Sequence, residues 1–131
     1  MISKTHRFHG YNSLKVVYSR GAIIRSGSMS LKYIVNPRRK TYRMAVVVSR
    51  KVHKSAVVRN YIRRRIYEIV RRLEPRVNDS YDLVFSIFSD QLSKQSASEL
   101  QKQVEYLLNQ AQVLHSGPEK SGRGIVKGKE I

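Results

Sequence analysis

Apolar residues recur every three or four positions through the middle of the chain, which is the spacing of one face of an α-helix. The stripe consists of Val58, Ile62, Ile66, Ile69 and Leu73. Ser55 suits the N-cap position because its side chain can accept a hydrogen bond from the first turn, and Pro75 cannot continue a helix. The pattern therefore predicts a helix from Ser55 to Glu74 whose apolar stripe packs on a core.

The opposite side of this predicted helix is rich in arginine. Its outer face consists of Asn60, Arg64, Tyr67 and Arg71. One flank adds Arg59 and Arg63, and the other flank adds Arg65 and Arg72. A solvated helix usually mixes charges of both signs, yet the only acids here are Glu68 and Glu74. Neighbouring arginines repel one another in the free protein, which indicates that a polyanion binds this surface. An ordinary soluble surface helix is the plainer alternative.

The remaining hydrophobic pattern predicts two more helices and four strands. The predicted segments are a short amphipathic helix over 11–19, strands over 22–25, 29–35, 42–49 and 81–88, and a helix over 96–114. Residues 26–28 form an expected turn, and the basic residues 36–40 form an expected hairpin loop. The uninterrupted apolar run from Met44 to Val48 favours a strand in the middle of a sheet, buried on both faces.

The order of these elements, αβββαβα, is typical of an α+β fold, a two-layer sandwich of helices against a mostly antiparallel four-stranded sheet. The strands on either side of the central helix can lie parallel, and the ordinary rule would make that crossover right-handed. We expect a basic arm over 1–10, a single RNA-binding domain over 11–115 and a disordered, Gly-rich basic tail over 116–131.

The net charge and its distribution along the chain limit the classes of function that fit this protein. The 131 residues have a net charge of +17, which is typical of proteins that bind nucleic acid. No acid precedes Glu68, whereas residues 1–67 contain 17 of the 26 lysines and arginines, so the pattern predicts a docking face in the N-terminal half. The absence of cysteine excludes disulfides and thiolate zinc sites, and no apolar run approaches the length of a membrane span. We therefore expect a cytoplasmic protein with no membrane partner.

Candidate catalytic chemistry is sparse. A nuclease usually needs clustered carboxylates to hold metal ions, or a histidine acid–base pair. The acids are sparse: Asp79 and Asp82 lie at an expected turn, and Glu68 is isolated among arginines. His6 and His9 could hold a metal only if the N-terminal arm were helical, the other two histidines are solitary, and there is no phosphate-binding glycine loop. We predict binding, with no catalytic residue and no metal site on this chain. Tyrosines beside basic positions, including Tyr18, Tyr33 and Tyr61, suit stacking on single-stranded RNA.

The segment from Arg43 to Glu68 joins a strand ending in Ser and a basic pair to an arginine-rich helix with an Arg-Asn motif. This combination resembles the signature of the bacterial ribonuclease P protein family. The residues that match it are Ser49, Arg50, Lys51, Ala56, Arg59, Asn60, Arg63, Arg64 and Glu68, and those that resemble the family's opening helix are Arg7, Phe8, Leu14, Val17, Tyr18 and Gly21. Tyr61 and Tyr67 stand where that family has arginine, and Leu14 stands where it usually has phenylalanine.

The resemblance implies an α+β fold with an unusual left-handed crossover, and a role as the protein subunit of a ribonucleoprotein that frees the mature 5′ end of transfer RNA. Catalytic groups and Mg²⁺ would belong mainly to the RNA, with no cofactor bound tightly by the protein alone and no protein oligomer required. The implied partners are ribonuclease P RNA and precursor tRNA. The residues implied to bind the RNA subunit are Arg50, Lys51, Arg59, Asn60, Arg63 and Arg64. Those implied to line a cleft for the 5′ leader are Leu14, Tyr18 and Tyr33.

Two other functions remain open at this point. A ribosomal or other structural RNA-binding protein would carry the same basic face and take no part in cleavage. A protein-only nuclease would need the carboxylate cluster that the sequence lacks. The affinities for ribonuclease P RNA and for an unrelated structured RNA distinguish a ribonuclease P subunit from the first alternative. A general binder should not discriminate between the two RNAs, because it gains only the phosphate contacts that both offer.

Overall fold

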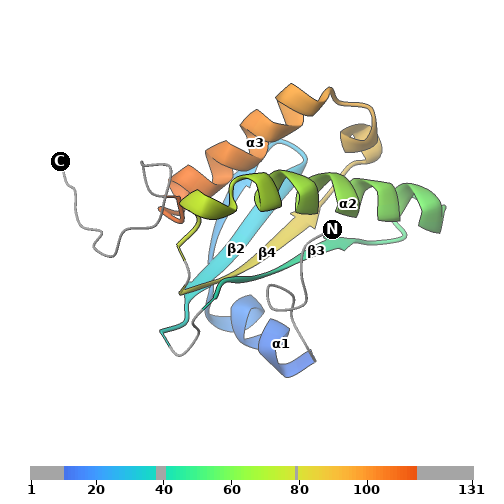
Figure 1. The fold of residues 1–131 in the computed structure, drawn as a ribbon. Helices are drawn as coiled ribbons and strands as arrows, with labels where there is room; N and C mark the ends of the chain where they lie inside the picture. The colour runs from blue at the N-terminus through green and yellow to red at the C-terminus, as the bar shows by residue number, and fades with distance from the viewer. Residues whose placement is uncertain (1–10, 38–40, 79, 115–131) are drawn as a thin grey trace.

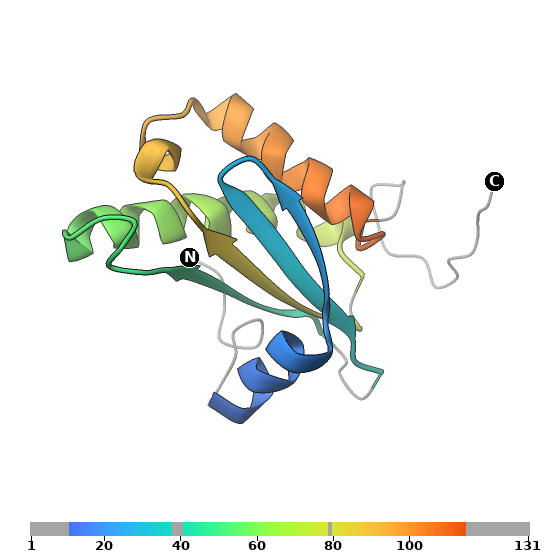
Figure 2. The ribbon, with the colours of Figure 1, turned by 180° about the vertical axis from the view of Figure 1, so that it is seen from behind.

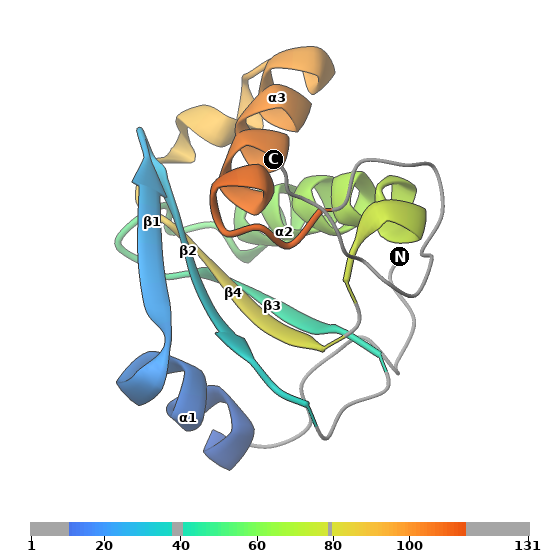
Figure 3. The same cartoon turned by 90° about the vertical axis from the view of Figure 1, so that its left-hand side faces the viewer.

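The computed structural model describes residues 11–37, 41–78 and 80–114, which form a four-stranded sheet with helices on both faces (Figure 1). The elements in chain order are α1 (Tyr11–Arg20), β1 (Ala22–Ser26), β2 (Met29–Val35), β3 (Arg43–Val48), α2 (Ala56–Arg72), η2 (Glu74–Arg76), β4 (Tyr81–Ile87), η3 (Asp90–Ser93) and α3 (Ala97–Gln110). The α+β class and the order αβββαβα are confirmed. Helices α2 and α3 cover one face of the sheet, and α1 lies on the other (Figures 2 and 3). The arm expected over 1–10 and the tail expected over 116–131 lie outside the described residues.

The sheet has the strand order β1-β2-β4-β3, so β4 lies between β2 and β3. Strand pairs β1·β2 and β2·β4 are antiparallel, and β3·β4 is parallel. Two sequence predictions are therefore wrong. The connection through residues 36–40, of which 38–40 lie outside the described residues, is not a hairpin loop, because the strands it joins do not pair.

The second correction concerns the strand buried on both faces. Strand β3 is an edge strand in which burial alternates, with Met44 and Val46 buried and Ala45 half-buried between them. The central strand is β4, where the four residues from Asp82 to Phe85 are all buried. Partners on both sides bury β4, whereas one edge of β3 remains without a strand partner in the described residues.

The connection from β3 through α2 to β4 is a left-handed crossover (Figures 1 and 3). With the parallel strands running away from the viewer in Figure 3, the chain leaves β3, returns through α2 above the sheet and enters β4 on the left of β3. Nearly all such crossovers are right-handed because of the twist of the strands. The handedness implied by the family resemblance is thus confirmed. The N-terminus of α2 follows the edge strand β3 after a short turn, so this turn and the first turn of α2 lie at the same end of the sheet.

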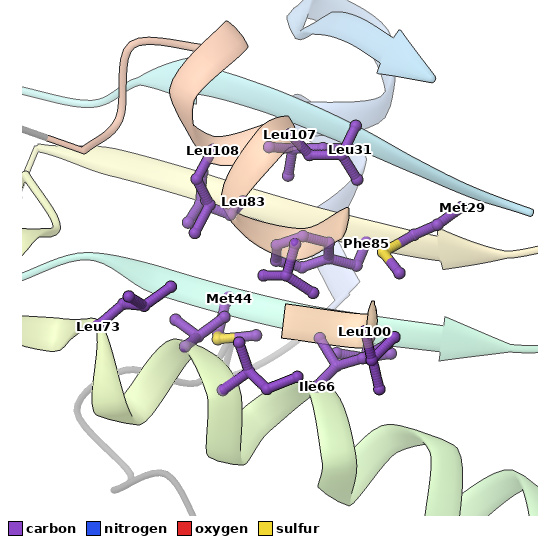
Figure 4. Close-up of a cluster of buried hydrophobic side chains, with 14 of the residues drawn as sticks. Met29, Leu31, Met44, Ile66, Leu73, Leu83, Phe85, Leu100, Leu107 and Leu108 are labelled. Carbon is purple, nitrogen blue, oxygen red and sulfur yellow. The ribbon is translucent and has the colours of Figure 1, made fainter. Parts of the chain in front are cut away.

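The main core lies between the sheet and the helices α2 and α3 (Figure 4). Alternate residues of the strands point into it, and α2 contributes the stripe expected from the sequence. The labelled core residues are Met29, Leu31, Met44, Ile66, Leu73, Leu83, Phe85, Leu100, Leu107 and Leu108. Each fully buried side chain of this size contributes about 1.5–3 kcal/mol to folding, so the core fixes which side of α2 faces the solvent.

The helix ends follow the capping residues. The Ser55 side chain accepts a hydrogen bond from the backbone N–H of Val58, and Ser96 and Glu99 form a capping box at the start of α3. Helix α3 ends at Gln110, before the expected end at residue 114. The chain then turns through Gln112, whose φ is 60°, and this left-handed residue stops the helix.

Candidate nucleic-acid interface

The solvent face of α2 is strongly basic because the apolar stripe occupies the opposite side. Arg64, Arg71 and Arg72 are exposed, and Asn60 and Tyr61 are exposed beside them. Arg64 makes no hydrogen bond or ion pair with any part of the chain that the structure describes. This guanidinium group is therefore fully available to an anion.

The turn between β3 and α2 adds Arg50 and Lys51, both exposed, to the start of this basic surface. The turn is ordered by its own backbone, since the N–H of Val52 donates to the carbonyl of Ser49 over 3.0 Å. The backbone N–H of Ser55 donates to Nδ1 of His53 over 3.0 Å. These hydrogen bonds hold the two cations next to the first turn of the helix.

Arg59 contributes to this surface mainly by positioning it. Its Nη1 donates to the carbonyl oxygens of His53 and Lys54, each over 2.9 Å. The side chain is half-buried and ties the first turns of α2 to the preceding turn. Arg63 donates to the side-chain oxygen of Asn60, which fixes the orientation of that amide. The structure thus brings together the residues implied to bind the RNA subunit, and it gives Arg59 a structural task as well.

Arg65 departs from the expected arrangement. The sequence pattern placed it on the outer guanidinium surface, but its Nη1 donates to the carbonyl of Leu92 over 2.8 Å and its Nη2 to the carbonyl of Gln95 over 2.6 Å. It therefore fastens α2 to the turn before α3. The available signal was its place at the edge of the apolar stripe, between Ile62 and Ile69.

A second surface lies on the opposite face of the sheet, where α1 crosses it. Val17 and Val84 are fully buried there, and Leu14 is half-buried. Tyr18 is 39% exposed, and the Nζ of Lys32 lies 5.2 Å from the centre of its ring. The same Nζ donates to the Tyr18 carbonyl over 3.0 Å. An aromatic ring beside a cation suits an RNA base with its phosphate.

Gly21 makes the tight turn from α1 into β1 possible. Its N–H donates to the Val17 carbonyl over 2.8 Å, and a Cβ at this position would lie 2.5 Å from that same oxygen. Any larger residue would force α1 away from the sheet. The glycine therefore sets the position of Tyr18 relative to the strands.

Tyr33 does not join Leu14 and Tyr18. Successive strand residues point to opposite faces, so Lys32 faces α1 and Tyr33 faces α3. The ring of Tyr33 lies 6.5 Å from that of Tyr81, at the border of the main core. Burial, and secondarily Tyr33, raise the pKa of Tyr81 above its ordinary value. Tyr33 therefore lies on the other face of the sheet from Leu14 and Tyr18, and Lys32 is the β2 residue beside Tyr18.

One aromatic group on the α1 face was missed by reasoning from the sequence pattern. The guanidinium of Arg25 lies 4.4 Å from the ring centre of Phe88, which is 48% exposed. Phe88 follows the last residue of β4, and no periodic signal marks it. Arg25 and Phe88 therefore add a second cation beside an exposed aromatic ring to this face of the sheet, outside α1.

Neither a metal centre nor a membrane segment is apparent in the residues that the structure describes. No group of three or more His, Asp or Glu side chains in these residues could hold a metal ion. Within the same residues, no helix has both the length and the apolar character needed to cross a bilayer.

Known proteins resemble this chain over most of its length. A family model described as Ribonuclease P matches residues 2–112. The ribonuclease P protein component of Picosynechococcus sp. is 32% identical over 114 residues, covering 87% of this chain and 97% of that protein. The one from Chloroflexus aurantiacus is 44% identical over 77 residues, covering 59% of this chain and 56% of that protein.

Solved structures show the same fold. The RNase P protein of Staphylococcus aureus superposes with a TM-score of 0.74 at 20% identity, covering 84% of this chain and 98% of that chain. The RNase P protein from Thermotoga maritima superposes with a TM-score of 0.70 at 20% identity, covering 79% of this chain and 96% of that chain.

Proposed function

Because the chain belongs to the ribonuclease P protein family, and is thus the protein component of a tRNA-processing ribonucleoprotein, we propose that the basic face of α2 binds the RNA component. The observation that carries this assignment is the exposed cationic surface that runs from the turn at Arg50 and Lys51 to Arg64. Its cations stand on a rigid helix whose other side is fixed in the core. Guanidinium groups on a helix that is fixed in the core suit the bidentate recognition of phosphate.

The second surface, around Tyr18 and Lys32, binds the single-stranded 5′ leader of precursor tRNA in this proposal. The support is the exposed ring beside an ammonium group, on the face of the sheet opposite α2. Stacking tolerates any base, and the cation pairs with the phosphates, so such a cleft can accept leaders of many sequences. Two separate faces allow the protein to touch both RNAs at once.

Hydrolysis itself is assigned to the RNA component and its Mg²⁺ ions. The described residues of this chain contain no cluster of carboxylates that could position such ions. The protein contributes positive charge between two polyanions, which lowers their repulsion and reduces the Mg²⁺ concentration that the assembly needs. It acts by binding and positioning.

The salt dependence of binding to ribonuclease P RNA tests the α2 face. In a filter-binding titration at several KCl concentrations, Arg64→Ala should weaken binding and lower the slope of log K against log salt by about one. Lys102→Ala removes an exposed cation of α3 and is the matched control, which should leave both quantities unchanged. Equal effects of the two variants, or equal affinity for an unrelated structured RNA, would favour a general RNA-binding protein.

A further inference from the structure

A groove of about 400 Å³ runs along the flank of α2 that faces the start of α3. Its floor is apolar, formed by Ile69 and the small side chain of Ala97, and Tyr61, Arg64 and Arg72 line it as well. The volume lies within the roughly 300–1,000 Å³ of sites that hold small organic groups. The groove thus combines an apolar floor, an aromatic wall and a basic rim.

Tyr61 is an exposed ring that lies beside an anchored side chain. The residue is 44% exposed, and the guanidinium of Arg65 lies 5.5 Å from the centre of its ring. Arg65 is in turn fastened to the carbonyl oxygens of Leu92 and Gln95, so it cannot easily leave the ring. A ring that is already oriented loses little conformational freedom when a flat group stacks on it.

We propose that Tyr61 is the stacking platform for an unpaired nucleobase of the RNA component, with Arg64 and Arg72 holding the adjoining phosphates. This inference rests on the proposed function of the α2 face and adds a base-binding subsite to it. Tyr61 stands where the resembling family has arginine, so a π surface replaces a charge at this point of the helix.

Charge favours RNA over a protein as the occupant. Arginines dominate the rim, and the acid that lines the groove, Glu68, has its Oε2 3.8 Å from Nη1 of Arg71. A basic rim around an aromatic wall is the arrangement that binds single-stranded nucleic acid, since the cations track phosphates while the ring stacks on bases. An apolar protein segment would leave these arginines desolvated without counter-charges.

A single tryptophan reports on this stacking directly, because the chain contains none. Tyr61→Trp places an indole in the groove, and Tyr106→Trp places one at a 49% exposed position of α3 as the control. The probes are the ribonuclease P RNA of the same organism and inorganic polyphosphate, which has the charge without bases.

We expect the RNA, but not polyphosphate, to quench the fluorescence of the Tyr61→Trp variant, and neither probe to quench that of the Tyr106→Trp variant. A base stacked on the indole accounts for such a difference, whereas nearby phosphate charge alone does not. Equal quenching of the Tyr61→Trp variant by both probes overturns the proposal, as does an absence of quenching although the RNA binds.

Affinity provides a second measurement that separates stacking from charge. Tyr61→Phe should bind the RNA like the wild type, whereas Tyr61→Ala should bind roughly 5- to 150-fold more weakly with an unchanged salt slope. Equal affinity of Tyr61→Ala and wild type contradicts the subsite while leaving the α2 face intact. Failure of the wild type itself to bind ribonuclease P RNA instead contradicts the proposed function.

Discussion

Arg65 donates a 2.8 Å hydrogen bond to the carbonyl oxygen of Leu92, and so joins the middle of α2 to the short helix η3. Its neighbour in the sequence, Arg64, is exposed to solvent. Two adjacent arginines therefore serve different purposes, one in holding the fold and the other in presenting charge. The difference arises because successive residues of a helix lie about 100° apart around its axis.

The first prediction compares these two arginines in stability. Arg65→Ala removes two hydrogen bonds from a charged donor and should lower the free energy of unfolding by about 1.5–3 kcal/mol, as measured by urea denaturation. Arg64→Ala should change it by less than about 0.5 kcal/mol, because it alters only an exposed side chain. Similar losses in the two variants would contradict the structural role of Arg65.

The second prediction concerns the ion pair between the parallel strands. Arg43 donates from Nε and Nη2 to the two carboxylate oxygens of Asp82, over 3.0 and 2.8 Å, and Asp82 is only 3% exposed. Removing one charge of a buried pair leaves the other poorly compensated, so Asp82→Asn should cost about 3–5 kcal/mol of stability. Asp90→Asn, at an exposed aspartate, is the control and should be nearly neutral in the same thermal and urea unfolding. A neutral Asp82→Asn would show that the pair does not hold β3 against β4.

The third prediction is a pH dependence of stability. Burial raises the pKa of Tyr81 in the folded protein, whereas the unfolded phenol ionises near pH 10. Above about pH 10 the unfolded state therefore loses the proton more readily, and the free energy of unfolding should fall as pH rises through the folded pKa. Tyr81→Phe should show a shallower fall, and the two proteins should diverge only in this alkaline range. Parallel curves in urea denaturation, from about two pH units below the unfolded pKa to about one above it, would contradict the assignment.

The fourth prediction separates the two tyrosines that the family resemblance assigned to the leader cleft. Tyr18→Ala should reduce the affinity gained from a 5′ leader by roughly 5- to 150-fold, because it removes an exposed stacking ring. Tyr33→Ala should leave that gain unchanged and lower stability instead, since its ring packs at the border of the core. The gain is the ratio of holoenzyme affinities for precursor tRNA and mature tRNA. The opposite pattern would place the leader on the α3 face.

Local periodicity accounts for what could be predicted of the fold. The stripe from Val58 to Leu73 and the cap at Ser55 are properties of one segment, and both are found in α2 as expected. Pairing between distant strands is not a local property. The apolar run at Met44 to Val48 therefore indicated a central strand, although β4 takes that place and β3 lies at the edge.

The candidate site likewise has parts that follow from the local sequence and parts that depend on distant residues. Exposure of Arg50, Lys51 and Arg64 follows from the helix stripe and the turn before it. The place of Arg65 at the edge of the apolar stripe is a local sign that its side chain turns inward. The carbonyl groups that it reaches are 27 and 30 residues away, and the sequence near Arg65 does not identify them. Tyr33 alternates along β2 with Lys32, so it packs with Met29 and Leu31 at the core, although the family resemblance grouped it with Tyr18.

Cleavage of precursor tRNA by ribonuclease P RNA at low Mg²⁺ is the most direct test of the central claim, that a cationic protein face lets two RNAs assemble. Wild-type protein and Lys102→Ala should both restore cleavage at the mature 5′ end. Arg64→Ala should need more protein or more Mg²⁺ to reach the same rate, because one phosphate contact is lost. If the wild type binds the ribonuclease P RNA of its own organism yet leaves cleavage unchanged at every Mg²⁺ concentration, the account is contradicted.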